Sequence, residues 1–361
     1  MNHGIKDIHL YSAVSTLSRP IADATHTISQ IKFYIVEIIT EAGIRGQGYL
    51  LGFQYSPNAI RGALRDMRDF ILRGDFSVDE TARLRNEYEN ECEYFGKGGL
   101  QRWALAVADV AMWDAWGRTL KQPIWRVLGS NRKKIPVYGS GGWLCYSDEE
   151  LLDEVLDYKG RGFKAVKIKV GSSDLERDLQ RIAMVREALG RECMIMMDAN
   201  QGMNLPDAIQ LSNRAKDLGI HWFEEPLVNT DFRGYRTLRS KTGISLAMGE
   251  REYDDNALKA LLDLNAIDLW QPDLIRIGGV EAWRNSAALA DAYHIPCLPH
   301  YYKDYDVPLL ATIRNPYGAE SFDWIDEIID NPMKVDRGFA IQREEPGWGF
   351  KFKEEFLEPL A

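Results

Sequence analysis

Cysteine is scarce in this sequence, with 4 residues among 361, and the four are far apart. They form neither a CxxC pair nor a zinc-like cluster, which argues against a zinc site and a disulfide scaffold. The N-terminal stretch also lacks the apolar core and small-residue cleavage site of a signal peptide. We therefore expect reduced thiols and a cytoplasmic location. The four cysteines are Cys92, Cys145, Cys193 and Cys297.

Long apolar runs and an excess of positive charge are also missing. No apolar run approaches the about 20 residues that a membrane helix needs, so no membrane partner is expected. The formal net charge of −10 argues against a nucleic-acid partner, because phosphate binding needs clustered Lys and Arg. An acidic chain must hold an anionic substrate with a local cation or metal. With 45% hydrophobic and 27% charged residues, the remaining composition is that of an ordinary globular protein.

Two different patterns divide the chain. Strand-like segments between about residues 5 and 50 precede helical stretches around Asn58–Leu72, Val78–Tyr94 and Gly99–Leu120, which suggests an α+β unit. From AVKIKV to AESFDWI, short apolar runs alternate with amphipathic segments, including a helix near Val307–Ile313. Seven or eight such units imply parallel strands in a closed barrel. We predict an α+β capping domain over residues 1–134 and a barrel over 135–325, with the tail of about 326–361 packing back on the first domain.

Ionisable residues fall at the ends of almost all the predicted barrel strands. Barrel enzymes build their active sites at the carboxyl ends of their strands, so these side chains should converge on one face. Burying a charge costs several kcal/mol unless the charge is paired or binds a metal, and a purely structural scaffold would avoid such a series. The series predicts a single site built from Lys167, Lys169, Asp198, Glu224, Glu250, Asp273, His300 and Glu320.

Three acids in this series, Asp198, Glu224 and Glu250, end successive strands at a spacing of 26 residues. Three carboxylates from neighbouring strands can hold one hard divalent cation and leave positions open for water and substrate oxygens, which favours Mg²⁺. No His or Cys accompanies them on these strands, which argues against zinc. The structural alternative is that they cap the helices that follow. Glu225 alternates to the other face, and we expect it to be structural.

The other charged residues of the series suggest acid/base chemistry. Lys167 and Lys169 are two apart on a strand and share one face, where they should lower each other's pKa and allow one to act as a base. The alternative for them is a solvated strand face. Asp273 next to His300 would fix the imidazole tautomer and raise its basicity, giving a second acid/base group. Glu320 could donate a hydrogen bond to a substrate carboxylate if crowding with other acids raises its pKa.

These motifs resemble the enolase superfamily, specifically its mandelate-racemase-like branch, over nearly the whole chain. The matching motifs, in order, are KIK at 167–169, DAN at 198–200, EEP at 224–226, GE at 249–250, PDLIRIGG from Pro272 and PH at 299–300. The resemblance implies a modified (β/α)₇β barrel with a capping domain that the C-terminal tail completes. Asp273 paired with His300 disfavours the branches that carry a lysine on the sixth strand.

The resemblance also implies roles for the residues. Asp198, Glu224 and Glu250 would be the ligands of one Mg²⁺ per site, and Lys169 would be the base on one face of the substrate α-carbon. Lys167 would help to neutralise the substrate carboxylate. His300, assisted by Asp273, would serve the other face, Glu320 would hydrogen-bond the enolate oxygen, and Asn200 would lie within reach of the substrate. The reaction implied is removal of the proton α to a carboxylate, giving an enolate that the metal stabilises.

The segment Pro20–Gln30 looks like the first capping loop of this family, and its Thr25 and His26 belong to a polar wall suited to hydroxyl groups. We therefore expect a small-molecule carboxylate substrate, a sugar acid (aldonate or aldarate), and its dehydration to a 2-keto-3-deoxy acid. A racemase, epimerase or cycloisomerase would use the same enolate, and a non-catalytic binding protein is a further alternative. Barrels of this kind often form symmetric homo-oligomers.

Overall fold

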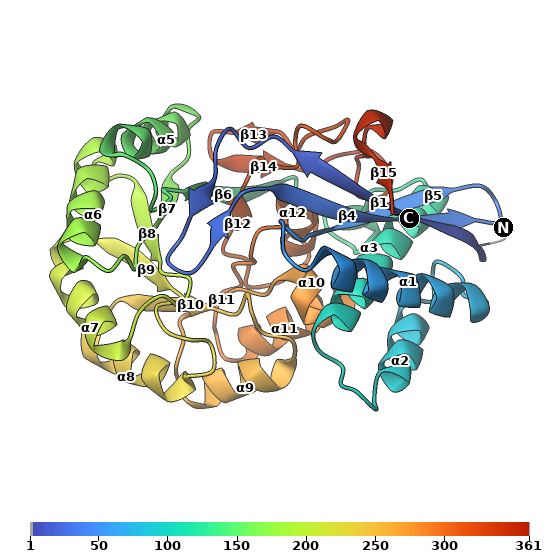
Figure 1. Ribbon diagram of the computed structural model, residues 1–361, viewed down its shortest axis with the longest axis horizontal. Helices are drawn as coiled ribbons and strands as arrows, with labels where there is room; N and C mark the ends of the chain where they lie inside the picture. The colour runs from blue at the N-terminus through green and yellow to red at the C-terminus, as the bar shows by residue number, and fades with distance from the viewer. Residues whose placement is uncertain (1–2, 361) are drawn as a thin grey trace.

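The computed structural model describes residues 3–360, which form a helix-ringed barrel beside an antiparallel sheet with its own helices (Figure 1). No helix within these residues is both long and apolar enough to cross a bilayer. The four cysteine thiols are unpaired, as the sequence predicts. The ends of the chain lie on the same side of the molecule, at the sheet rather than at the barrel.

The barrel is built from parallel strands joined by crossover helices. Its sheet has the order β11-β10-β9-β8-β7-β6, β12 pairs with β6, and bridges from Trp270 to Cys297 and from Cys297 to Pro316 complete the ring. This arrangement confirms the predicted modified (β/α)₇β barrel. The strands are β6 (Lys134–Gly141), β7 (Ala165–Lys169), β8 (Met194–Asp198), β9 (Ile220–Glu224), β10 (Ser245–Met248), β11 (Leu269–Trp270) and β12 (Ala319–Ser321).

The crossover helices surround the barrel on the outside (Figure 1). Several start at polar side chains that accept backbone N–H groups of the first turn, such as Ser147 before α5 and Asp174 before α6. The helices are α5 (Asp148–Gly160), α6 (Leu175–Leu189), α7 (Leu205–Arg214), the 3₁₀ turn η1 (Lys216–Leu218), α8 (Phe232–Thr242), α9 (Asp255–Asp263), α10 (Leu274–Ile277), α11 (Val280–Ala292) and α12 (Lys303–Leu310).

A plug of apolar side chains fills the inside of the barrel. Its members are Tyr138, Ala165, Met196, Trp222, Ala247, Leu269 and Leu298. Because side chains alternate along a strand, the residue two positions later points to the same interior. Ala165, Met196, Trp222 and Leu298 are therefore followed at that spacing by Lys167, Asp198, Glu224 and His300. The charged side chains therefore lie directly above this apolar layer, at the carboxyl ends of the strands.

The N-terminal part is an antiparallel sheet in the order β15-β1-β4-β5 with helices packed on it. Helix α3 lies very close to β5, and two glycines permit this approach: a Cβ on Gly46 would lie 2.4 Å from Ala111 O, and one on Gly48 would lie 2.5 Å from Val107 O. The elements are β1 (Ile5–Ser15), β2 (Ile21–Ala22), β3 (Thr27–Ile28), β4 (Ile31–Thr40), β5 (Arg45–Leu51), α1 (Pro57–Arg73), α2 (Thr81–Glu91), α3 (Leu100–Leu120) and α4 (Ile124–Val127).

The C-terminal tail returns to both parts of the molecule. Its elements are β13 (Val335–Asp336), β14 (Phe339–Ile341), the 3₁₀ turn η2 (Glu354–Phe356) and β15 (Glu358–Pro359). Strand β14 pairs with β6 of the barrel, and β15 pairs with β1 of the first sheet. The tail thus completes the capping sheet, as the fold prediction has it, whereas the residue limits of the two domains stay a prediction.

Helix α12 differs from the sequence prediction because it begins at Lys303 rather than near Val307. Two charges of the segment before Val307 are buried in ion pairs: Lys303 Nζ lies 2.8 Å from Asp323 Oδ1, and Arg343 Nη2 lies 2.5 Å from Asp304 Oδ1. Pairing removes most of the cost of burying these charges, so the helix can start inside this segment.

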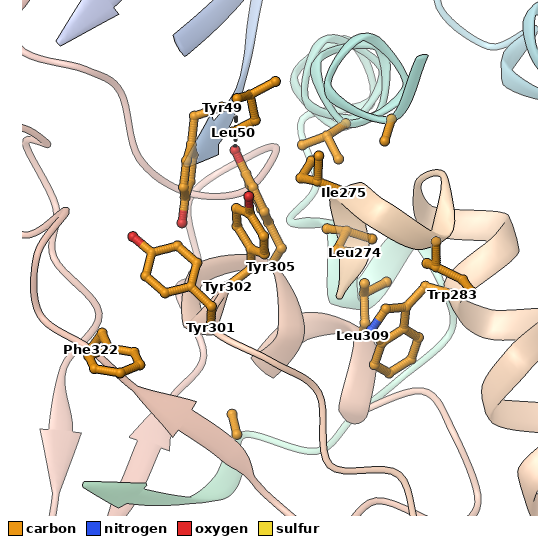
Figure 2. Close-up of a cluster of buried hydrophobic side chains, with 14 of the residues drawn as sticks. Tyr49, Leu50, Leu274, Ile275, Trp283, Tyr301, Tyr302, Tyr305, Leu309 and Phe322 are labelled. Atoms are coloured by element: carbon orange, nitrogen blue, oxygen red, sulfur yellow. Dashed lines mark hydrogen bonds between the residues drawn. The ribbon is translucent and has the colours of Figure 1, made fainter. Parts of the chain in front are cut away.

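Two tyrosines of this segment join the barrel to the free edge of β5. The backbone N–H of Tyr49 donates to the Tyr305 hydroxyl at 3.0 Å, and that of Leu51 donates to the Tyr302 hydroxyl at 3.0 Å. Figure 2 shows the rings of Tyr302 and Tyr305 side by side below Tyr49. An edge strand needs partners for its outward N–H groups, and here the segment that follows His300 supplies two of them.

Candidate active site

A cavity of about 380 Å³ lies at the carboxyl ends of the barrel strands, within the size range of small-molecule sites. The structure brings the predicted strand-end residues together there. Seven of them line the cavity, namely Lys167, Lys169, Asp198, Glu250, Asp273, His300 and Glu320. The eighth, Glu224, is completely buried and is bonded to Lys167. The capping part closes the other side, with Asp23, His26, Phe53 and Trp103 among its lining residues.

Lys167 connects three carboxylates. Its Nζ lies 2.5 Å from Glu224 Oε1, 2.7 Å from Glu320 Oε1 and 3.4 Å from Asp198 Oδ2, although only 1% of its side chain is exposed. Lys169, two residues further along β7, lies 2.5 Å from Asp198 Oδ2. Both lysines therefore face into the site, as predicted from their spacing.

The prediction that the pKa of these lysines is lowered overall is wrong for this arrangement. Burial does lower the pKa of both ammonium groups, and Lys167 lowers that of Lys169. The carboxylates outweigh these effects, chiefly Glu224 and Glu320 for Lys167 and Asp198 for Lys169. The pKa of Lys169 is consequently raised, and that of Lys167 is raised well above its ordinary value.

The three predicted metal ligands lie at the ends of three adjacent strands. Asp198 and Glu224 end β8 and β9, which pair in register at these two residues, and Glu250 follows β10 by two positions. Burial and the neighbouring Asp198 raise the pKa of Glu224 to about 7, although Lys167 opposes them. Buried carboxylates that repel one another, with oxygen as the only ligand atom, are a donor set that suits a hard divalent cation.

The acid oxygens are turned to basic groups in this arrangement. Within residues 3–360, no three His, Cys, Asp or Glu side chains surround a common point as a complete metal shell. Besides the lysine contacts, Glu250 Oε1 lies 2.6 Å from Arg251 Nη1, and Glu224 Oε2 accepts a hydrogen bond from Gln271 Nε2 at 2.7 Å. The donor set fits Mg²⁺, and rotations of these side chains would be needed to aim all three carboxylates at one ion.

His300 and Asp273 form the predicted dyad. His300 Nδ1 lies 2.8 Å from Asp273 Oδ2, which leaves Nε2 directed at Glu250 Oε2, 3.3 Å away. The other oxygen of Asp273 accepts the backbone N–H groups of Ile275 and Arg276 and so caps α10. Burial lowers the pKa of His300, but Glu250 and the bond to Asp273 outweigh it, so the pKa is raised.

Glu320 lies at the predicted place in the cavity, but its pKa is lowered rather than raised. Burial raises its pKa, yet Lys167 and His300 outweigh burial, and the pKa lies below the ordinary value. Its Oε2 accepts the backbone N–H of Tyr301 at 2.9 Å. The condition on which Glu320 could donate a hydrogen bond, a raised pKa, is therefore not met here, because cations rather than acids dominate its surroundings.

The capping loop reaches the site through a small hydrogen-bonded cluster. Asp23 Oδ1 lies 3.2 Å from His26 Nδ1, and both residues line the cavity. The Thr25 hydroxyl donates to the backbone carbonyl of Asn200 at 3.0 Å, so Thr25 fastens the loop to the barrel and is absent from the cavity lining. Asn200 does line the cavity, and its buried Oδ1 has no hydrogen-bond partner among the described residues.

The sequence reasoning missed two arginines and a group of aromatic residues. Arg251 and Arg276 line the cavity, and Arg276 Nη1 donates to the Glu250 carbonyl at 2.8 Å. Arg251 directly follows a predicted metal ligand, so its position was a usable signal. Trp143 and Trp324 follow β6 and β12, but a search for charged strand ends overlooks aromatic side chains.

Comparisons with known proteins agree with this geometry. The family model "Mandelate racemase / muconate lactonizing enzyme, N-terminal domain" matches residues 7–129, and "Enolase C-terminal domain-like" matches residues 150–356. The chain is 29% identical to a 3,6-anhydro-α-L-galactonate cycloisomerase of Streptomyces coelicolor, over 94% of this chain and 95% of the relative. It is 27% identical to an arabinonate dehydratase of Saccharolobus solfataricus, over 89% and 88% of the two chains.

A solved structure is similar over almost the entire length. It is described as a racemase from Streptomyces coelicolor A3(2) with bound magnesium, is 26% identical, and superposes with a TM-score of 0.92 over 97% of this chain and 98% of the other. The similarity therefore extends to both the capping part and the barrel, and the comparison structure holds the metal that the acid series predicts.

Proposed function

The chain belongs to the family of mandelate racemase and muconate lactonizing enzyme, and on this premise we propose that it is a Mg²⁺-dependent enzyme that removes the proton α to a carboxylate. The reaction we favour is dehydration of a sugar acid to a 2-keto-3-deoxy acid. The observation that carries the proposal is that Lys169 and His300, each bonded to its own aspartate, face one cavity beside three buried acids.

The metal would be held by Asp198, Glu224 and Glu250, which offer carboxylate oxygens from three adjacent strands. Bound there, Mg²⁺ supplies positive charge to the substrate carboxylate and competes with the lysines for the acid oxygens. The similar racemase with bound magnesium supports this assignment.

The remaining residues divide the proton transfers. Lys169 would take the α-proton as its neutral amine, which requires Asp198, the main cause of its raised pKa, to turn from it to the metal. Lys167 places a cation among Glu224, Glu320 and Asp198, where negative charge collects. His300 protonates the departing C3 hydroxyl from the other side, while Asp273 holds its tautomer through Nδ1. The C2–H electron pair forms the enolate, the C3–O bond breaks and water leaves. The enol then becomes the 2-keto group.

The activities of the relatives support both elimination and isomerisation. The arabinonate dehydratase supports loss of water, and the anhydrogalactonate cycloisomerase supports the alternative in which the same enolate leads to an isomer. Both reactions begin with removal of the same proton, so the roles of Lys169 and His300 hold for either. A racemase or epimerase would also reprotonate this enolate.

A screen of aldonates and aldarates with Mg²⁺, with semicarbazide detection of 2-keto acids, tests the proposed dehydration. We expect keto acid from at least one sugar acid, and none after chelation of the metal or in Lys169→Ala. Deuterium uptake at C2 in D₂O without keto acid would favour the racemase or epimerase. No product and no exchange across a broad set would refute α-proton chemistry.

A further inference from the structure

An aromatic wall, consisting of Trp143, Tyr301, Phe322 and Trp324, lines the cavity beside Lys169. The rings of Phe322 and Trp324 stack with centroids 4.4 Å apart, and those of Trp143 and Trp324 stack at 6.0 Å. Lys169 Nζ lies 5.2 Å from the centre of the Trp143 ring. The negative face of an aromatic ring attracts C–H groups and offers few hydrogen bonds. The wall therefore suits the C–H face of a substrate rather than its hydroxyl groups.

The capping part brings no lysine or arginine to the cavity among the described residues. Its ionisable groups there are Asp23, His26 and Tyr55. Asp23 accepts the backbone N–H groups of Thr25 and His26, each at 2.7 Å. Burial raises the pKa of Asp23, but its bond to His26 and the charge of Lys169 outweigh burial and hold the pKa below the ordinary value. Asp23 thus presents a full negative charge to the cavity from the capping side.

The other polar capping groups already have partners and provide little positive charge for an anion. The Tyr55 hydroxyl donates to the Thr27 carbonyl at 2.9 Å, and His26 is paired with Asp23. Several further capping residues in the lining are apolar, including Ile28, Ile60 and Leu100. A second carboxylate beside Asp23 would meet its negative charge, and the cations that act on Asp23, Lys169 and Arg251, both come from the barrel side.

The cations of the barrel side lie beside the predicted metal ligands. Lys167 and Lys169 hold Glu224 and Asp198, and Arg251 lies 2.6 Å from Glu250 Oε1. Arg276 donates to the Glu250 carbonyl at 2.8 Å and lies 3.7 Å from its carboxylate. These groups gather around one carboxylate-binding end of the cavity. Both arginines approach Glu250, so they add positive charge at that end and do not form a separate site for a second carboxylate.

We infer that the cavity selects sugar acids with a single carboxylate, such as aldonates or their ring forms, packs their C–H face on the aromatic wall and rejects dicarboxylates. This inference rests on the proposed function and narrows its substrate class. Trp324 and Asp23 are the specificity-determining residues. Trp324 provides an apolar surface for the C–H face of the substrate, and Asp23 repels a second carboxylate.

The direct test compares matched pairs of substrates that differ only in oxidation of the terminal carbon, such as gluconate with glucarate and galactonate with galactarate. The unmodified enzyme is assayed with Mg²⁺ for keto acid and for C2 deuterium uptake. We expect kcat/KM for the monocarboxylate of a reactive pair to exceed that of the dicarboxylate by about 100-fold, since juxtaposed like charges are strongly unfavourable.

Two substitutions assign this selectivity to residues. Asp23→Asn removes the negative charge at nearly constant shape, and it should narrow the ratio between the two substrate classes by about 10-fold. Trp324→Leu should raise KM for the monocarboxylate about 10-fold with a smaller change in kcat, whereas Trp324→Phe, which keeps a ring, should restore most of the affinity. Circular dichroism checks that each variant is folded.

The outcomes separate the two proposals. Equal or faster turnover of dicarboxylates by the unmodified enzyme overturns the selectivity but leaves α-proton removal standing. An unchanged ratio in folded Asp23→Asn, or an unchanged KM in folded Trp324→Leu, removes that residue from the account. Absence of both keto acid and exchange with every sugar acid overturns the proposed function, and the selectivity with it.

Discussion

At the residue scale, carboxylates at the barrel mouth each hold two different groups. Asp198 pairs with Lys169 through one oxygen and accepts the backbone N–H of Asn200 through the other. Asp273 likewise serves His300 and the first turn of α10. Such double use favours the observed orientations, because a carboxylate that turns away loses a buried hydrogen bond unless a metal ion replaces it.

Glu224→Gln should weaken Mg²⁺ binding by about 10- to 100-fold or more, because one of three carboxylate ligands loses its charge. Isothermal titration calorimetry measures the effect. Glu252→Gln is the matched control, since Glu252 is also buried but bonds to Asn229 instead. Equal Mg²⁺ affinity in Glu224→Gln and the unmodified enzyme would contradict the ligand assignment.

Asp273→Asn should lower kcat by about 100- to 10,000-fold, because the amide no longer fixes the tautomer of His300 or stabilises its charged form. An Asn also caps helices well, so the cap on α10 should survive and the free energy of unfolding should change little. Steady-state kinetics together with urea unfolding separate the two roles. A large loss of stability alongside the loss of activity would point to a structural role for Asp273.

The residues of the site could largely be predicted from the sequence, whereas their charge states could not. The position of Lys169 follows from alternation along a strand, but its raised pKa depends on Asp198, which lies 29 residues away and 2.5 Å distant. The charge of Glu320 depends in the same way on Lys167. Trp324 was missed because an aromatic residue after a strand gives no sequence signal of where its ring points.

At the element scale, the edge of β5 is held by the segment that follows His300, the histidine proposed as acid/base. Tyr302 and Tyr305 accept backbone N–H groups of β5, and the strand leads directly into the loop that carries Phe53 into the cavity. Figure 2 shows this junction of tyrosines. The position of the loop that carries Phe53 and that of His300 are therefore linked through one short segment.

Tyr305→Phe should lower the free energy of unfolding by about 1–3 kcal/mol, because the buried N–H of Tyr49 would lose its acceptor. Urea unfolding measures the change. Tyr34→Phe is the control, since the hydroxyl of Tyr34 has no hydrogen-bond partner among the described residues and its removal should cost little. Equal stability of Tyr305→Phe and the unmodified protein would show that this hydrogen bond contributes nothing.

Asp109 of α3 links the capping part to the start of α11, where it accepts the backbone N–H of Val280 at 2.8 Å. Burial raises the pKa of Asp109 to about 7, against the bond from Val280 and the charge of Arg85. A pKa above the unfolded value means that the folded state keeps the proton longer. Stability from this group should therefore fall by about 1.4 kcal/mol per pH unit as pH rises towards 7, and level off above it.

Asp109→Asn should remove this pH dependence, because the amide keeps an acceptor for Val280 and cannot ionise. Urea unfolding between pH 5.5 and 8.5, compared between the two proteins, isolates the contribution of the one group. Parallel stability curves for the two proteins would show that Asp109 does not titrate in this window.

At the scale of the whole molecule, the alternating pattern of strands and helices was enough to predict the barrel, because each unit repeats the same local signal. Long-range pairings were harder: β15 meets β1 across almost the full chain, and Cys297 closes the ring through isolated bridges. Neither leaves a periodic pattern. The early start of α12 was hidden because its charges find partners as distant as Arg343.

The proposed chemistry lies at the barrel, whereas the proposed selection of substrate involves both the barrel, through Trp324, and the capping part, through Asp23. The residues proposed for proton transfer and metal binding lie at the ends of the barrel strands, and the capping part supplies Asp23 and the apolar lining opposite them. The aromatic wall follows barrel elements, so it stands fixed beside the base. Substitutions in the capping part should therefore change which acid is used more than whether a proton is removed.

The central claim is that Lys169 and His300 act on opposite faces of one α-carbon. It is tested most directly by NMR measurement of C2 deuterium uptake in D₂O with Mg²⁺, using both C2 epimers of a reactive sugar acid. We predict that Lys169→Ala loses exchange of one epimer while keeping the other, and that His300→Asn shows the reverse. Unchanged exchange of both epimers in either variant would contradict the assignment.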